Sequence, residues 1–269
     1  MRSIVILLFS SIILAPLFAK TLTLGVVPQQ SPIELIKAWQ PVVAYLENAT
    51  GEKVILKIER SIPEFEKVLY SGGYDIAYLN PYHYVVAHKR QGYIAQVLDS
   101  KNIVGILVVR KNSGISDVSM LKGKSFLFPA PDSFAATLLP KYELLKKYGI
   151  DINGEKNYRY VNSHDSVYKG VARGIGDVGG GIDRTFNNLE DKETKDSLVI
   201  LYKTKAYPSH PFAFSSSMPE TLKAKLVKAL IEMPVPILNS LNMKHLSETN
   251  DAEYDSVRDI AISLPSTQE

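Results

Sequence analysis

Short apolar segments alternate with amphipathic ones along this 269-residue chain, and this order constrains the fold more than any other feature. Residues 21–27 (TLTLGVV) alternate as a strand does, and residues 31–51 place apolar side chains at helical spacing, with a break expected at Pro41. Strand and helix continue to follow one another without an internal repeat. This order is typical of α/β proteins, because each helix returns the chain for a parallel neighbour. The sequence predicts mixed, mostly parallel sheets with helices on both faces.

The alternation runs through two cycles, which indicates two α/β lobes. The second cycle comprises a strand at 125–128, a helix at 133–148, a strand at 158–161, a helix at 165–173, and strands at 177–181 and 198–204. The chain is expected to cross between lobes near 108–113 and to return near 204–210, so the second lobe is inserted in the first. The predicted division is a signal peptide at 1–19, the first part of lobe 1 at 20–107, lobe 2 at 108–205, and the return into lobe 1 with the C-terminal helices at 206–269.

The first nineteen residues have the composition of a secretory signal peptide. Arg2 precedes an unbroken apolar run, and Ala19 is a small residue where a signal peptidase would cut. The alternative is a retained anchor, which the run is slightly too short to favour, since spanning a bilayer takes about 20 apolar residues. The chain has no cysteine, so neither a lipid-modified cysteine nor a disulfide is available. The sequence therefore predicts a soluble periplasmic protein.

Charge and motif content exclude several classes of protein. The net charge of +3 falls to +2 without Arg2, which is too small to indicate nucleic-acid binding. The five histidines have no metal-ligand spacing, and neither a nucleophile elbow nor a Walker loop is present. Residues 174–179 (GIGDVG) match a dinucleotide-binding pattern, but they follow a helix and precede a strand, which is the wrong order. We expect no metal, no cofactor and no catalysis.

The strand-to-helix junctions are the places to look for a ligand, because ligands in open α/β sheets lie beyond the carboxyl ends of the strands. Residues 128–140 (FPAPDSFAATLLP) form one such junction, with Asp132 or Ser133 as helix cap. The first amides of a helix have no intrahelical acceptor, and they favour a bound anion. The alternative is an ordinary capped helix packed closely on the sheet.

Two further junctions repeat the arrangement. His164 follows a predicted strand and can donate to an oxyanion, while Asp165 is expected to cap the next helix. Asp183 follows a glycine-rich strand, where it can accept from a protonated ligand oxygen or serve as a cap. Each of these residues is also compatible with a purely structural role.

Nine segments together resemble the periplasmic phosphate, phosphite and phosphonate binding proteins of ABC transporters. They are GVVP (25–28), AWQPVVAYLENATG (38–51), YDIAYLNPYHYV (74–85), SGISDVSMLKGKSFLF (113–128), PDSFAATLLPKYELLKKYGID (131–151), NSHDSV (162–167), ARGIGDVGGG (172–181), YPSHPFAF (207–214) and MPETLKAKL (218–226). The resemblance covers nearly the whole mature chain. It implies a class II periplasmic binding protein, with two α/β lobes, a hinge of two crossings and an oxyanion held between the lobes.

The resemblance also implies where the ligand lies. The Ser-Thr-Ser helix start of the family falls on Ser133, Phe134 and Ala135, so only the first hydroxyl is retained, and the family's histidine falls on His164. His210 stands where aminophosphonate binders carry an acidic residue, which suggests a different oxyanion or an organic ligand. The candidate ligand-binding residues are Ser61, Tyr78, Tyr82, Ser133, Phe134, Ala135, His164, Asp183 and His210.

The function implied by the resemblance is capture of a small oxyanion and its delivery to an ABC permease in the inner membrane, by a monomer that closes around its ligand. One alternative is a sensor that presents the ligand-bound form to a membrane histidine kinase. Another is an enzyme on this fold, which the absence of cysteine disfavours.

Overall fold

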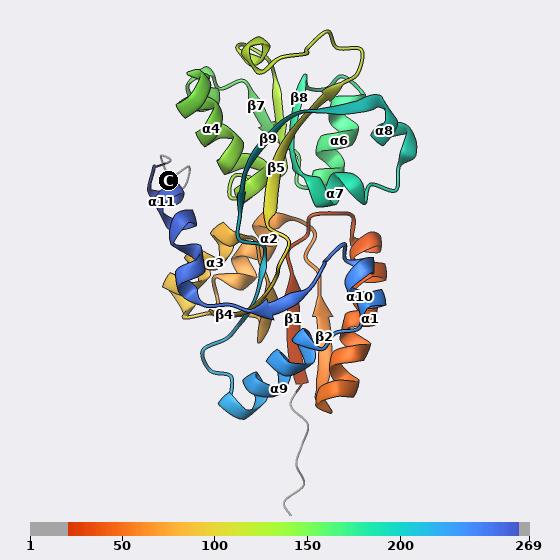
Figure 1. The fold of residues 1–269 in the computed structure, drawn as a ribbon, viewed down its shortest axis with the longest axis vertical. Coiled ribbons are helices and arrows are strands. Elements are labelled where there is room, and N and C mark those ends of the chain that lie inside the picture. Colours follow the sequence, from red (N-terminus) through yellow and green to blue (C-terminus); the bar gives the residue numbers. More distant parts are fainter. Residues whose placement is uncertain (1–20, 264–269) are drawn as a thin grey trace, which may run out of the picture.

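The computed structural model describes residues 21–263, and the predicted signal peptide lies outside this range. Two lobes, each built on one sheet, are joined by long strands that pass between them (Figure 1). The first sheet has six strands in the order β11 (Leu246–Glu248), β4 (Ile94–Asp99), β10 (Pro211–Phe214), β3 (Ile76–Tyr78), β1 (Thr21–Val26) and β2 (Lys53–Lys57). The second has five, in the order β7 (Tyr158–Tyr160), β6 (Phe126–Phe128), β8 (Val178–Ile182), β5 (Ile103–Arg110) and β9 (Leu198–Tyr207).

Helices flank both sheets, as the alternation predicted. The first lobe contains α1 (Pro32–Thr50), α2 (Ile62–Leu69), α3 (Pro81–Gln91), α9 (Glu220–Ile231), α10 (Val235–Ser240), η3 (Asp251–Tyr254) and α11 (Asp255–Ser263). The second contains η1 (Val118–Leu121), the π-helical turn η2 (Phe134–Leu138), α4 (Leu139–Tyr148), α5 (Ile152–Glu155), α6 (His164–Ala172), α7 (Asp183–Asn187) and α8 (Lys192–Ser197). Across residues 21–263, no helix is both long and apolar enough to cross a membrane.

Strand directions confirm the predicted fold class of two α/β lobes with mixed sheets. Strand β1 pairs in parallel with β2 and β3, whereas β10 lies antiparallel between β3 and β4. In the second sheet β6 is parallel to β7 and β8, and β5 is antiparallel to β8 and β9. Most strands of each sheet therefore share one direction. Strands β5, β10 and β11 run against the others, and of these β5 and β10 enter a lobe from the other one.

The first crossing comes earlier in the chain than the sequence indicated. Strand β5 pairs with β9 from Ile103 onward, so the predicted lobe boundary between 107 and 108 falls inside a strand of the second sheet. The side chains of β5 explain its apolar sequence, because Leu107 and Val109 enter the core on one face while Ile106 and Val108 enter the core on the other. A strand covered on both faces carries no polar residue to mark where one lobe ends.

The capping residues show why the helices of the first lobe start where they do. The side chains of Ser31, Ser61 and Asn80 each accept a hydrogen bond from an amide in the first turn of the following helix. The predicted break at Pro41 was wrong, since α1 runs through it from Pro32 to Thr50. The apolar face of α1 packs on the sheet on both sides of the proline, and this packing outweighs the lost backbone hydrogen bond.

Candidate functional site

The two lobes meet where the carboxyl ends of strands in both sheets face each other, and hydrogen bonds join them there. The amide of His164 donates to the carbonyl oxygen of Gln29 (3.0 Å). The amide of Ser31 donates to Asp165 Oδ2 (3.0 Å), and Asn80 Nδ2 donates to the carbonyl oxygen of Asp132 (3.1 Å). Because Gln29, Ser31 and Asn80 belong to the first lobe and their partners to the second, the lobes are in a closed arrangement.

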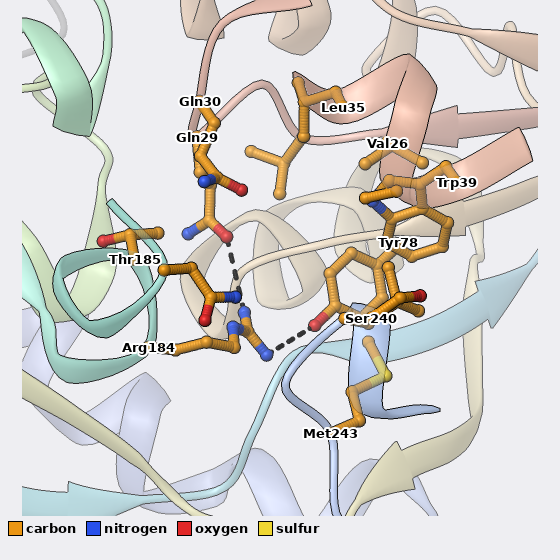
Figure 2. A pocket seen from close by; sticks show the side chains of 14 residues that line it. Val26, Gln29, Gln30, Leu35, Trp39, Tyr78, Arg184, Thr185, Ser240 and Met243 are labelled. Atoms are coloured by element: carbon orange, nitrogen blue, oxygen red, sulfur yellow. Dashed lines mark hydrogen bonds between the residues drawn. The ribbon is translucent and has the colours of Figure 1, made fainter. Parts of the chain in front are cut away.

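A guanidinium group occupies the centre of this boundary. Arg184, in the first turn of α7, donates to Tyr78 Oη (2.8 Å) and to Gln29 Oε1 (3.4 Å), both in the first lobe (Figure 2). Both of these partners are neutral, and among residues 21–263 no carboxylate forms an ion pair with Arg184. A partly buried cation without a counter-ion is costly, and an anionic ligand would relieve that cost.

His210 lies beside the guanidinium, and one N–H group of its ring faces no acceptor. Its ring stacks on Tyr78 with centroids 5.4 Å apart, and its Nε2 lies 3.1 Å from Gln29 Nε2. Since Gln29 Oε1 accepts from Arg184, the Gln29 amide nitrogen donates to His210 Nε2, and the ring proton is then on Nδ1. That Nδ1 is 3.5 Å from an Arg184 nitrogen, so two donors face each other. One acceptor oxygen beside the pair, within hydrogen-bond distance of each nitrogen, would satisfy both.

His164 has one ring nitrogen without a partner. Its side chain is fully buried, and Nδ1 lies 3.0 Å from Thr185 Oγ1, which is also bonded to Tyr168 Oη (2.7 Å). Its Nε2 is buried and has no hydrogen-bond partner in the part of the chain that the structure describes. Burial and the nearby Arg184 lower the pKa of His164 to about 3.

The ring of His210 is neutral as well. Burial, followed by Arg184, holds the pKa of His210 well below its usual value. Arg184 is therefore the one formal charge in the cluster formed by Gln29, Tyr78, His164, Arg184 and His210, which we call the arginine cluster.

The helix start predicted to bind an anion lies at the same boundary. Ser133 precedes η2 without a side-chain capping bond, and its carbonyl oxygen accepts from the amides of Thr137 and Leu138. The amides before Thr137 have no intrahelical acceptor. The turn lies directly on the second sheet, where a Cβ at Gly105 or Gly180 would come within 2.0 Å of a carbonyl oxygen of η2. Ala135 and Ala136 therefore belong to a close helix-to-sheet contact.

The structure brings together some of the predicted site residues. Tyr78, His164 and His210 belong to the arginine cluster, whereas Phe134 is buried and packs edge-on against Tyr207, with centroids 5.4 Å apart. Ala135 is buried in the same turn. Asn80, which donates to the carbonyl oxygen of Asp132 just before the helix start, is two residues from Tyr78 of the arginine cluster.

Three predicted residues have other contacts. Asp183 lies 3.9 Å from Lys101, on the hinge side of α7. Ser61 accepts from the amide of Glu64 (3.4 Å), which is the local capping role. Tyr82 lines a surface groove between α3 and α11, and burial raises its pKa to about 12. Within residues 21–263, none of the three is hydrogen-bonded to the arginine cluster.

The prediction that Asp165 caps α6 was wrong. Ser163 is the cap, since its side chain accepts from the amide of Ser166. Asp165 lies one residue into the helix and instead accepts from Ser31 of the other lobe. The sequence shows the acidic residue in the first turn, but not that its partner is 134 residues away.

Sequence reasoning missed Arg184, Gln29 and Thr185. Arg184 follows Asp183 directly at the end of β8, and Gln29 follows the end of β1, so both occupy the strand-end position that marks the other junctions. A search for polar residues at every strand end would have found them.

The arrangement as a whole offers one cation, two neutral imidazoles, a phenol and free amides. These groups are suited to a small anion.

A small recess opens beside Arg184. It has a volume of about 40 Å³, and Leu35, Trp39 and Met243 form its apolar wall (Figure 2). No group of three or more His, Cys, Asp or Glu side chains within residues 21–263 is arranged to hold a metal ion.

Two α/β lobes with hydrogen-bond donors converging between them form the architecture of the two-lobed solute-binding proteins. Residues 24–254 match the family described as "ABC transporter, phosphonate, periplasmic substrate-binding protein". The chain belongs to this family of periplasmic substrate-binding proteins.

Individual relatives agree with the family. The phosphate-import protein PhnD of Mycolicibacterium smegmatis is 25% identical over 263 residues, which cover 90% of this chain and 78% of that protein. A binding protein component of an ABC phosphonate transporter from Pseudomonas aeruginosa has the same fold, with a TM-score of 0.84, 18% identity, and coverage of 91% of this chain and 86% of that one. PhnD1 of Prochlorococcus marinus, solved with methylphosphonate, gives a TM-score of 0.83 and 19% identity over 91% of this chain and 98% of that one.

Proposed function

We propose that this periplasmic binding protein captures a small oxyanion of the phosphate, phosphite or phosphonate class between its lobes and delivers it to an ABC permease. The observation that carries the proposal is Arg184, which lies at the lobe boundary among neutral partners and without a carboxylate. The names of the relatives in the family point to the same class of ligand.

Each group of the site has a distinct role in this proposal. Arg184 supplies charge-assisted hydrogen bonds to the anion, and His210 Nδ1 donates to an oxygen held between the two side chains. His164 Nε2 bonds a further ligand oxygen and so gains the partner it lacks. On the other side, the Ser133 hydroxyl and the amides of Phe134 and Ala135 donate without adding a full charge.

Closure follows from the position of these groups in both lobes. Tyr78 and Gln29 belong to the first lobe, and Arg184 and His164 belong to the second, so only the closed arrangement lets one anion contact all of them. The ligand stabilises the closed state by its higher affinity for that state, and the permease recognises the closed surface. Asp183, Ser61 and Tyr82 then have supporting roles outside the contact with the ligand.

We further propose that the signal peptide is cleaved after Ala19 and that the mature protein acts as a monomer. In this proposal it has no catalytic activity, no cofactor and no nucleic-acid partner. The arginine cluster contains no acid or base able to exchange protons near neutral pH, since burial and Arg184 lower the pKa of both histidines.

Isothermal titration of the protein from Lys20 onward, freed of bound solute by partial unfolding, tests the proposal. The ligands are phosphate, phosphite, methylphosphonate, aminoethylphosphonate, sulfate and selenate. We expect one-to-one binding of at least one phosphorus oxyanion, weakened roughly a hundredfold by Arg184→Ala and roughly tenfold by His164→Ala. Arg60→Ala, at an exposed arginine of the first lobe, is the matched control. The proposal is overturned if none of the six anions binds, or if the Arg184→Ala protein binds as tightly as the wild type.

A further inference from the structure

Two carboxyl groups from different lobes meet at the lobe boundary, outside the arginine cluster. Glu34 belongs to the first turn of α1 and Asp165 to the first turn of α6, and these helices lie in different lobes (Figure 1). Asp165 is buried, and its Oδ2 accepts from the amide of Ser31 (3.0 Å), while its carboxyl group also contacts that of Glu34. This contact between two acids therefore exists only while the lobes are closed.

The contact lacks a hydrogen-bond donor. Asp165 Oδ1 and Glu34 Oε2 are both buried, and neither has a hydrogen-bond partner among residues 21–263. Two ionised carboxylates in this position would repel each other and leave both oxygens unsatisfied. A single proton between them removes the repulsion and supplies the missing hydrogen bond.

The other ionisable groups near the pair do not replace that proton. Burial and then the glutamate raise the pKa of Asp165 to about 7, and Lys169, one turn further along α6, opposes this shift only in part. Lys37 of α1 lies 3.2 Å from Glu190 Oε1 of the second lobe. Tyr168 keeps its own proton, since burial raises its pKa. Within residues 21–263, no lysine or arginine forms an ion pair with either carboxyl group of the pair.

We propose that the closed protein binds one proton between Glu34 and Asp165, so that capture of the ligand is coupled to uptake of this proton. The inference rests on the proposed function, because the ligand is what closes the lobes. When the lobes open, the two carboxyl groups separate, and a carboxyl group exposed to water ionises at about pH 4. At neutral pH the open protein therefore releases the proton. The proton and the ligand both favour the closed state, so each increases the affinity for the other.

The sign of the effect on affinity follows from the two states. The closed state holds the proton up to about pH 7, whereas the open state has lost it above about pH 4. The affinity for the ligand is therefore high at about pH 5 and falls as the pH rises through about 7. The rise in the pKa of Asp165 allows at most roughly a hundredfold change in affinity between about pH 5 and about pH 8. Water and Lys169 at the edge of the cleft reduce the expected change to about tenfold.

Titration of methylphosphonate at about pH 5 and about pH 8 tests the inference, with phosphite or phosphate as the probe where methylphosphonate does not bind. The proteins are the wild type, Asp165→Asn and Glu34→Gln, and each amide supplies the missing donor at every pH. The ligand's own titration is the same for all three proteins, so it cancels when variant and wild type are compared. We expect the affinity of the wild type, relative to that of either variant, to fall about tenfold from the lower pH to the higher. Asp196→Asn, at an exposed carboxylate of the second lobe, is the control and should behave as the wild type.

The number of protons taken up gives a second test. Heats of binding measured in buffers of different ionisation enthalpy give this number directly. At about pH 6 the wild type should take up as much as about one proton more per ligand than either variant. The double variant should behave as each single variant does, because the two carboxyl groups share one proton. A contact with a purely structural role would change the affinity by the same factor at each pH and would leave the proton uptake unchanged. If one variant fails to fold, the other one carries both tests.

The outcomes separate the two proposals. If a phosphorus oxyanion binds but the wild type and the variants share one pH dependence and one proton uptake, the pair is not a proton site, and the inference fails while the proposed function stands. If no phosphorus oxyanion binds at all, the proposed function fails and takes the inference with it.

Discussion

Replacing Asp165 by Asn tests how the lobes are held together at the outer edge of the site. Asp165 Oδ2 accepts from the Ser31 amide of the other lobe (3.0 Å). Asp165 Oδ1 and Glu34 Oε2 are buried, and neither is hydrogen-bonded to a donor among the described residues. The two carboxyl groups lie against each other across the boundary, so both cannot be ionised without repulsion. One shared proton converts this contact into a hydrogen bond.

The sign of the pH dependence follows from the position of that proton. Burial, and then Glu34, raises the pKa of Asp165 from 3.8 to about 7. The folded protein keeps the proton over a range in which the unfolded chain has released it, so this carboxyl lowers the free energy of unfolding as the pH rises from about 4 to about 7. A rise of this size corresponds to at most roughly 4 kcal/mol. Water and Lys169 at the edge of the cleft reduce the expected effect to roughly 1–2 kcal/mol.

Urea unfolding of the wild type and of Asp165→Asn at about pH 5 and about pH 8 measures this effect. Asn keeps an acceptor for Ser31 and can donate to Glu34 at every pH. We expect the stability of the variant relative to the wild type to increase by roughly 1–2 kcal/mol between the two pH values. Glu34→Gln should give the same increase, and Asp196→Asn, at an exposed carboxylate, should give none. A difference between variant and wild type that does not change with pH would refute the reasoning.

Three other substitutions test single features of the fold. Gly180→Ala should lower the free energy of unfolding by roughly 2–4 kcal/mol, because the new Cβ would lie 2.0 Å from the Ala136 carbonyl oxygen. An unchanged midpoint of urea unfolding would contradict the close contact. Burial lowers the pKa of Lys141 to about 8, so the wild type should gain stability between about pH 8 and about pH 10.5, and Lys141→Met should not. The pKa of His164 is lowered to about 3, so below about pH 6.5 the unfolded chain takes up a proton that the folded protein does not. The free energy of unfolding of the wild type should therefore fall as the pH falls below about 6.5, and that of His164→Gln should fall less. An equal fall in the two proteins would argue against this.

The elements of this fold are predictable because their signals are local. The Ser31, Ser61 and Asn80 caps each bond an amide three residues along the chain, and the sequence carries both partners of each bond within one turn. The β5 strand shows the limit of local signals. Its residues are apolar because both faces are covered, and that pattern does not say which sheet it joins. The lobe boundary was therefore placed at 108, five residues beyond the start of the strand at Ile103.

The site was predictable only as far as position along a strand decides it. His164 was singled out because it follows a predicted strand, at the edge of the sheet where ligands bind. Tyr78 and His210 were named only through the resemblance to the binding-protein family. Asp183 and Arg184 show what remained beyond reach. They are neighbours in the first turn of α7, yet Asp183 faces Lys101 at the hinge while Arg184 reaches Tyr78 in the other lobe. Consecutive residues at the start of a helix point about 100° apart, so the direction of each depends on how α7 is docked. That docking is set by pairings between β8 and β5 that the sequence does not display.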